Sequence, residues 1–335
     1  GRIATEMARK HERIVQHGTQ SRSSRNWDRI VQVVRSEHYG PLKVAYGLCH
    51  KVRRSIGFKS PKMPPAEVDF DLWLGPVRMQ PYHENLVHYN WHWFWDTGNG
   101  DLGNQGVHQM DIARWGIKDA TLPKSVVSVG GRVGYEDQGE TANTQLAVFD
   151  FGEAQLIFEV RGLVAKNNVT NYFVTTEGTI KADGKFYPHN GGTPENIPDV
   201  ASTRGPGKGH IGNFLAAVRS RNPQDLNADI LEGHYSSSLC HLANISYRLA
   251  KVETGVSSGD VFAGNDAATT AMDHLRKHLT GDAGLKLDET PWRVGPRMEI
   301  DLAQERFAKS EHSDKANALL TRRYRAPFGV PDRVA

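Results

Sequence analysis

Cysteine is scarce in this sequence, with only Cys49 and Cys240 among 335 residues. The two lie far apart and neither belongs to a C-x-x-C pair, so the sequence offers no disulfide framework of the kind that holds small secreted domains together. We expect two buried thiols, and a single disulfide between them is the alternative.

Excess charge of either sign is also missing. The 41 Lys and Arg residues against 38 Asp and Glu give a net charge of +3, and the basic residues are scattered. Nucleic acids and anionic membranes attract clustered positive charge, which this chain lacks. No apolar run approaches the ~20 residues that a membrane span needs. We therefore predict a globular protein that binds neither nucleic acid nor a membrane.

The first residues, Gly1-Arg2-Ile3-Ala4, are neither a start methionine nor a signal peptide. Because residues 3–12 have helical spacing of apolar positions, the sequence starts as if inside a helix. We expect further sequence upstream, and the compartment is not predicted because an export signal would lie there.

Residues 1–40 follow the order helix, strand, helix. The helix over 3–12 leads to a short strand at 13–16 and a loop at 18–26. An amphipathic helix over 27–38 follows, with Ile30, Val33 and Val34 on one face. This order is typical of the end of a doubly wound α/β domain.

The remainder predicts an α/β (α+β) domain with a largely antiparallel, open sheet, which we place at residues 41–325. A strand near 43–53 precedes a Pro-rich irregular stretch and a helix over 104–117. Five segments then alternate apolar and polar residues, as strands do: 124–133, 143–151, 154–163, 170–176 and 179–187. Helices at 210–221 and 228–252 follow, and the rest is irregular with short helical pieces.

Two motifs are misleading. Gly98, Gly100 and Gly103 spell G-x-G-x-x-G, but a dinucleotide fingerprint follows a hydrophobic strand, and here WHWFWDT precedes it. His83-Glu84 and His88 form H-E-x-x-x-H, one residue longer than the zinc-protease spacing, so the second histidine leaves the helix face of the first. We expect no metal.

An aromatic cluster runs from His88 to Trp95 and includes Trp91 and His92. Sugars stack their C–H faces on rings and bind polar groups through their hydroxyls, so this cluster is a candidate wall of a sugar site. A large hydrophobic core shows the same composition, and that alternative stays open.

The segment with the clearest chemistry is GNGDLGNQGVHQMD. Asn104 and His108 are four residues apart and therefore share one helix face. His108 falls in the first turn, where the helix dipole disfavours imidazolium and leaves a base usable near neutral pH. Asp111, one turn later, can orient a neighbour or cap a buried polar group. A purely structural role for this histidine is the alternative.

The block GNGDLGNQGVHQMDIARW resembles the helix signature of the glucose–fructose oxidoreductase/inositol dehydrogenase (Gfo/Idh/MocA) family. GTQSRS, VDFDLWLGP, GETANTQLAVFDF and EGHYSSSLCHLANISYRL resemble further parts of its bacterial members, in the same order. The resemblance implies a Rossmann domain followed by an α/β domain, NAD or NADP as cofactor, and hydride transfer with a sugar or polyol. It also implies that the Gly-rich phosphate turn and a Glu-Lys-Pro motif precede Gly1, so that residues 1–40 are the end of the Rossmann domain.

By the same resemblance, His108 is the catalytic acid/base. Asn104 stands where many members have Asp, and an amide holds a hydroxyl but accepts no proton. The resemblance places Gln20 and Arg22 near the cofactor, and we include Asp111, Trp91 and His92 with Asn104 among the substrate-binding candidates. His210 and His234 join them from the later helices, although surface or packing roles are equally open.

The predicted function is that of an NAD(P)-dependent sugar or polyol dehydrogenase or reductase. Two alternatives remain: an NAD-dependent glycoside hydrolase of the same fold, and a non-catalytic fragment. The resemblance also implies a homo-oligomer, a dimer or tetramer, formed through the outer face of the antiparallel sheet.

Overall fold

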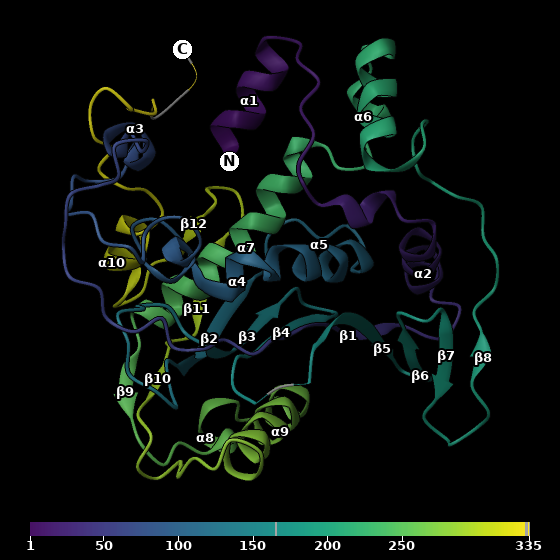
Figure 1. The fold of residues 1–335 in the computed structure, drawn as a ribbon. Helices are drawn as coiled ribbons and strands as arrows, with labels where there is room; N and C mark the ends of the chain where they lie inside the picture. The colour runs from purple at the N-terminus through teal and green to yellow at the C-terminus, as the bar shows by residue number, and fades with distance from the viewer. Residues whose placement is uncertain (165, 332–333, 335) are drawn as a thin grey trace.

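The computed structural model describes residues 1–164, 166–331 and 334. One mixed sheet forms the centre, with helices on both faces (Figure 1). Its strands are β1 (Leu42–His50), β2 (Ser125–Gly131), β3 (Thr144–Asp150), β4 (Gln155–Arg161), β5 (Asn168–Thr175), β6 (Gly178–Lys181), β7 (Lys185–Pro188), β8 (Glu195–Asn196), β9 (Lys251–Glu253), β10 (Trp292–Val294), β11 (Met298–Asp301) and β12 (Arg306–Phe307).

The helices are α1 (Arg2–Lys10), α2 (Arg25–Arg35), α3 (Phe70–Leu74), α4 (Gly100–Asn104), α5 (Gly106–Gly116), α6 (Gly209–Ser220), α7 (Ile230–Arg248), α8 (Ser258–Val261), α9 (Asp266–Gly281) and α10 (Ser313–Ala318). Three 3₁₀ turns join them: η1 (Gln20–Ser23), η2 (Asn90–Trp93) and η3 (Pro223–Asp225).

The sheet has the order β12-β11-β2-β3-β4-β1-β5-β6-β7-β8. β1 runs parallel to β4 and every other pairing along this path is antiparallel. The largely antiparallel open sheet predicted from alternation is confirmed. The segment 179–187, expected as one strand, is the β6–β7 hairpin, because the chain turns back at Gly184 with a φ of +74°.

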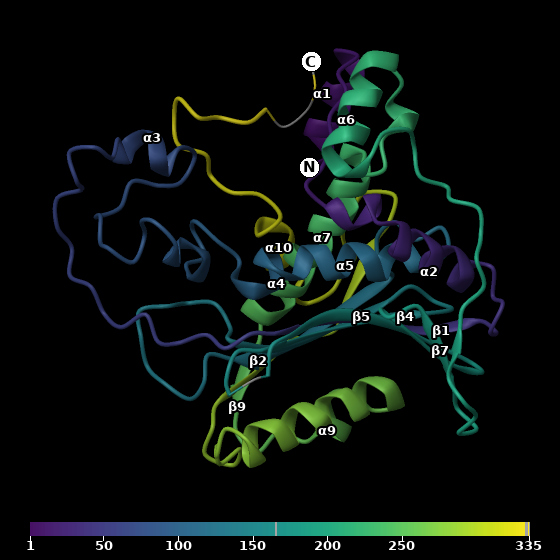
Figure 2. The ribbon, with the colours of Figure 1, turned by 45° about the vertical axis from the view of Figure 1, so that its right-hand side comes forward.

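Helices α5 and α7 lie on one face of the sheet and are joined there by α2 (Figure 2). Helix α5 approaches the strands closely because it has glycine where it touches them. A β-carbon on Gly106 would lie 2.9 Å from the ring of Phe158, and one on Gly116 would overlap the ring of Phe173. These close contacts fix the distance between α5 and the sheet.

Helix α2 shares this core. Ile30, Val33 and Val34 are at most 1% exposed and cluster with residues of β5 and β7, including Phe173 and Phe186. The domain boundary predicted at residue 40 therefore does not coincide with a gap in packing. Ser24 caps α2 by accepting a hydrogen bond from the amide of Trp27.

The opposite face of the sheet is covered by α9 (Figure 2). Met272, Leu275 and Leu279 are fully buried there against residues such as Ile157 and Trp292. The expectation of only short helical pieces after residue 252 is wrong at this point, since α9 has 16 residues.

The N-terminal segment folds around the helical face. Residues 13–16 form no strand ladder; Gln16 makes a single bridge to Asp229.

Cys49 and Cys240 are both free and buried, as expected, and burial raises the pKa of each thiol to about 12. Within the part of the chain that the structure describes, no helix has the length and apolar content to cross a membrane.

Candidate functional site

The glycine-rich segment before the candidate base packs on protein atoms. A β-carbon on Gly98 would lie 2.5 Å from the carbonyl oxygen of His92, and one on Gly100 would lie 2.9 Å from Thr141. The helix expected over 104–117 corresponds to α5, whereas Asn104 ends the preceding helix α4, so Asn104 and His108 lie on two consecutive helices separated by Gln105. Neither strand nor phosphate-cradling turn occurs here, which supports rejection of the dinucleotide fingerprint.

His108 is the third residue of α5, in the first turn as predicted. Its side chain is half-buried, and Nδ1 is enclosed without a hydrogen-bond partner among the residues that the structure describes. The ring nitrogen left for a ligand is therefore Nε2. Burial lowers the pKa of His108, and the charge of Asp111 opposes that shift in part. The imidazole is neutral near pH 7 and can accept a proton.

Two further candidates have polar side chains without partners inside the described residues. Asn104 ends α4, half-buried, and its amide makes no hydrogen bond there. Gln20 begins η1 with an exposed side chain. The turn η1 packs against α5, the helix that carries His108. Such unpaired groups are available to a ligand.

Arg22 and Asp111 need a correction. They were expected to contact cofactor and substrate, but they bind each other in the interior. Arg22 Nε lies 3.0 Å from Oδ1 and 2.9 Å from Oδ2 of Asp111. The side chains are 6% and 0% exposed. Burial alone would raise the pKa of Asp111, yet the charge and hydrogen bonds of Arg22 hold it below its usual value. Neither side chain is free for a ligand.

Sequence reasoning missed His17, which stands directly before this loop. Its half-buried ring packs against α7 at Gly233. Burial lowers the pKa of His17, the charge of Asp111 opposes that shift in part, and the charges of His108 and His210 add to it. His210, a predicted residue, belongs to this cluster and lies 2.7 Å from the amide nitrogen of Gln16. No periodic pattern in the sequence identifies His17 as a candidate site residue, because it lies in an irregular segment.

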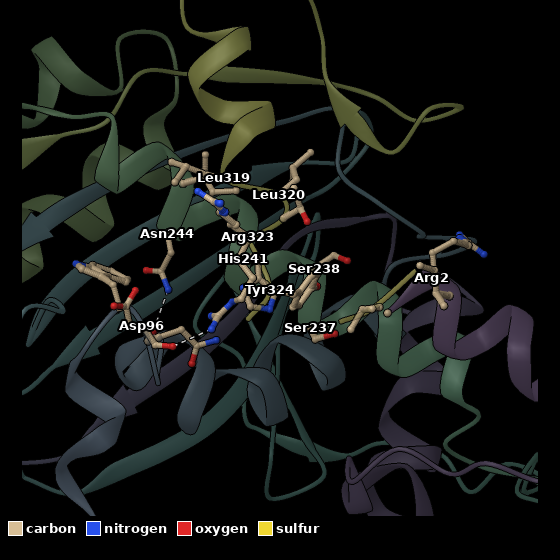
Figure 3. Close-up of a pocket in the computed structure, with 18 of the residues that line it drawn as sticks. Arg2, Asp96, Ser237, Ser238, His241, Asn244, Leu319, Leu320, Arg323 and Tyr324 are labelled. Atoms are coloured by element: carbon tan, nitrogen blue, oxygen red, sulfur yellow. Dashed lines mark hydrogen bonds between the residues drawn. The ribbon is translucent and has the colours of Figure 1, made fainter. Parts of the chain in front are cut away.

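His234 and Trp91 belong to a different space. Both line a cavity of about 1880 Å³ between α1, α7 and the segment 319–331. Figure 3 shows this cavity, with Ser237, Ser238 and His241 of α7 labelled. Positions 234, 237, 238 and 241 of α7 share the face that meets this cavity, whereas Glu232 and Ser236 face α5. His234 is bound to Glu305 at 3.0 Å. The expectation that it joins His108 in one cleft is wrong on this geometry.

His92 stacks on Trp91, with ring centroids 3.7 Å apart, and its Nδ1 meets the carbonyl oxygen of Tyr89. These contacts make the pair part of the η2 fold. Two cations that the sequence did not single out contact the α4 segment and Gln105, which precede α5. Lys51 Nζ is 3.5 Å from the side-chain oxygen of Gln105, and Arg53 pairs with Asp101 at 2.5 Å. Their position at the end of β1 follows only from the fold.

The H-E-x-x-x-H motif does not assemble a metal site. Glu84 pairs with Lys62, and the ring of His83 lies 5.2 Å from that of Phe94. Across residues 1–164, 166–331 and 334, no group of three or more His, Cys, Asp or Glu side chains is arranged to hold a metal ion.

Comparison with solved structures finds similar folds. A candidate NADPH-dependent oxidoreductase from Desulfitobacterium hafniense has a TM-score of 0.50 at 10% identity, over 72% of this chain and 65% of that one. The WlbA dehydrogenase from Bordetella pertussis, in complex with NADH and UDP-GlcNAcA, has a TM-score of 0.46 at 15% identity, over 72% and 63%. The chain thus spans less than two thirds of these relatives. No curated protein sequence matches it.

A family model described as "Oxidoreductase family, C-terminal alpha/beta domain" matches residues 55–280. That span includes β2 to β7, the α4–α5 segment with Asn104 and His108, and α7. It covers more than half of the sequence and agrees with the mixed α/β fold described above. The chain belongs to the Gfo/Idh/MocA oxidoreductase family.

Proposed function

We propose that this protein takes part in NAD(P)-dependent hydride transfer to or from a sugar or polyol, with His108 as the catalytic acid/base. The observation that carries the proposal is the state of His108: a half-buried, neutral imidazole whose Nε2 has no partner within the described residues. Family membership supports an oxidoreductase.

In the oxidative direction, His108 Nε2 accepts the proton of a carbinol hydroxyl while the hydrogen on carbon departs as hydride. Asn104 donates or accepts a hydrogen bond at a substrate hydroxyl and orients it. It takes no proton, because an amide does not ionise in this range. Proton exchange therefore depends on His108 alone among these two side chains.

A nicotinamide cofactor, when bound, supplies the hydride acceptor or donor. The described residues fit the reacting end of such a cofactor and not its phosphates. Gln20, exposed and unpaired on η1, can bind the end that meets the substrate. No strand–turn–helix with the glycine fingerprint occurs among residues 1–164 and 166–331 to hold the pyrophosphate. The proposal therefore assigns the cofactor's phosphates to none of the described residues.

Turnover in the full-length natural protein tests this proposal. A panel of sugars and polyols is offered with NAD⁺ and NADP⁺, and reduced cofactor is followed by absorbance. At least one substrate should give stoichiometric reduced cofactor. His108→Ala should lower kcat by ~10²–10⁴-fold, the usual contribution of general acid–base catalysis, with little change in cofactor affinity.

Other outcomes identify the alternatives. Release of an aglycone without net reduced cofactor would favour the glycoside hydrolase. Sugar binding with no turnover in either direction would favour a binding protein. Near-normal kcat in His108→Ala would remove His108 from the proposed role.

A further inference from the structure

We propose that Arg22 and Asp111 are a positioning pair, whose contact fixes the loop 18–23 against α5 and so sets Gln20 and His108 in register with each other. The inference rests on the proposed function for its catalytic consequence. Neither residue touches substrate or cofactor in this role, since both are enclosed.

The pair belongs to a closed ring of contacts that joins three elements. Arg22, in η1, binds Asp111 of α5 through Nε and Glu232 of α7 through Nη2, the latter at 3.0 Å. Ser236 of α7 donates to Asp111 at 2.7 Å and accepts from Arg114 Nε at 3.1 Å. Arg114 then returns to Glu232. One guanidinium thus connects the loop to both helices.

Charge balances within the ring, because two arginines face two carboxylates. Removing Arg22 and Asp111 together leaves Arg114 paired with Glu232, so no uncompensated buried charge results. Buried ion pairs are weak contributors to stability, and apolar replacements of similar volume are often neutral or stabilising. If this ring of contacts served stability alone, apolar side chains of similar volume could therefore replace it.

The position of this ring of contacts also links Gln20 to His108. Arg22 lies two residues after Gln20 in the same 3₁₀ turn, and Asp111 lies three residues after His108 in the same helix. The guanidinium also stacks over the Trp115 ring, 5.3 Å from its centroid. Fixing Arg22 to Asp111 therefore fixes the distance between the two groups that are proposed to meet substrate and cofactor. Displacement of reacting groups by about 1 Å can cost ~100-fold in rate.

The test replaces both charges at once, as Arg22→Met with Asp111→Leu. We expect the thermal midpoint to be unchanged or higher. Turnover should fall by about 10- to 100-fold, with a smaller change in KM. Hydrogen exchange supplies a readout without activity. The amides of Arg22 and Ser24, bonded to Thr19 and Ser21 in η1, should lose protection.

The matched control is another buried pair, Arg132 and Asp137, replaced as Arg132→Met with Asp137→Leu. Its contacts are 2.6 Å long, its side chains are 13% and 0% exposed, and it lies in the β2–β3 connection. It should leave kcat and η1 protection unchanged. If the first double variant does not fold, Arg22→Lys takes its place: it keeps the charge but loses the planar, multidentate contact, and should show the same loss of protection and turnover.

Normal turnover together with normal η1 protection, in whichever variant folds, would overturn the positioning role. Equal losses in the Arg132/Asp137 control would also overturn it, since they would reduce the effect to general destabilisation. Failure of the proposed function looks different. The unaltered protein would then lack hydride transfer, while exchange at Arg22 and Ser24 would still distinguish the variants.

Discussion

Within the described residues, no group accepts a hydrogen bond from Nδ1 of His108. In many catalytic histidines a carboxylate on Nδ1 stabilises the imidazolium, whereas here Nδ1 is buried and unpartnered. Asp111 is the nearest acidic residue along the helix, but its carboxylate oxygens accept hydrogen bonds from Arg22 and Ser236. The site therefore favours the neutral imidazole of His108 and does little to stabilise the imidazolium that forms when His108 accepts a proton.

A pH dependence follows from this environment. Burial lowers the pKa of His108 from the ordinary value of 6.5, so the base form persists below pH 6.5. Nuclear magnetic resonance of labelled histidine rings should show His108 titrating below 6.5, its signal identified by its loss in His108→Gln. The acid limb of kcat/KM for oxidation should lie in the same range. Titration above 6.5 would contradict the buried, partnerless ring.

Asn104 gives a second prediction at this scale. Because its amide binds and does not exchange protons, Asn104→Ala should raise KM by about 10-fold, the equivalent of one hydrogen bond, and lower kcat less. Asn104→Asp should be tolerated, since it keeps an acceptor at the same place. A loss confined to kcat would assign Asn104 to the chemical step instead.

The sequence predicted individual residues where local spacing decides their place. The first-turn position of His108 followed from the helix start. The pairing of Arg22 with Asp111 did not, because the two are 89 residues apart and their contact is tertiary. The same limit separated His234 from His108: the choice between the two faces of α7 depends on what packs against each.

At the scale of elements, Gly233 of α7 packs against the loop before η1. A β-carbon on Gly233 would overlap the His17 ring. Gly233→Ala should therefore destabilise the protein by about 1–3 kcal/mol through overpacking, measured by denaturant unfolding. His17→Ala in the same chain should restore stability, because it removes the ring that the methyl group displaces.

Gly212→Ala in α6 is the control. There a β-carbon meets nothing closer than 3.7 Å, and alanine is the better helix former by up to about 1 kcal/mol. Stability should rise or stay level. Equal destabilisation at both positions would mean that the contact with His17 is not what makes Gly233 necessary.

Element prediction from sequence was limited by context in the same way. Alternation identified β2 to β5 because each strand has apolar side chains at regular spacing. Helix α9 also carries a regular set, with Ala268, Met272, Leu275 and Leu279 buried, but its surroundings of Gly and charged residues obscured it. The break between α4 and α5 was not predicted, although Gly103 and Gly106 flank Gln105 and glycine is a poor helix former.

For the whole molecule, cofactor affinity is a direct prediction. The chain as printed should bind NAD(H) and NADP(H) weakly, because a dinucleotide fingerprint must directly follow a strand. The sequence has G-x-G-x-x-G at residues 98–103 and again at 207–212, but η2 precedes the first and a stretch outside any helix or strand separates β8 from the second. Isothermal titration is the measurement. A dissociation constant near ~1 µM, equivalent to about −8.2 kcal/mol, would require a phosphate site that this fold does not display.

Assembly is the last prediction. The resemblance implies association through the outer face of the sheet, and α9 covers part of that face. What stays partly exposed lies on β1 and β5, where Tyr46 and Tyr172 stack at 4.5 Å, half-buried. Because half-buried aromatic pairs are common at interfaces, we expect the full-length protein to be a dimer or tetramer that uses this remaining area.

Light scattering at high and low concentration measures the assembly. Thr170→Lys places a charge on β5, on the side of Tyr172, and should shift the protein toward the monomer. Leu72→Glu, at a 66% exposed position of α3 away from that face, should not. A monomer at every concentration would refute association altogether. An oligomer indifferent to Thr170→Lys would place the interface elsewhere, because a buried, unpaired lysine in the predicted contact would cost several kcal/mol.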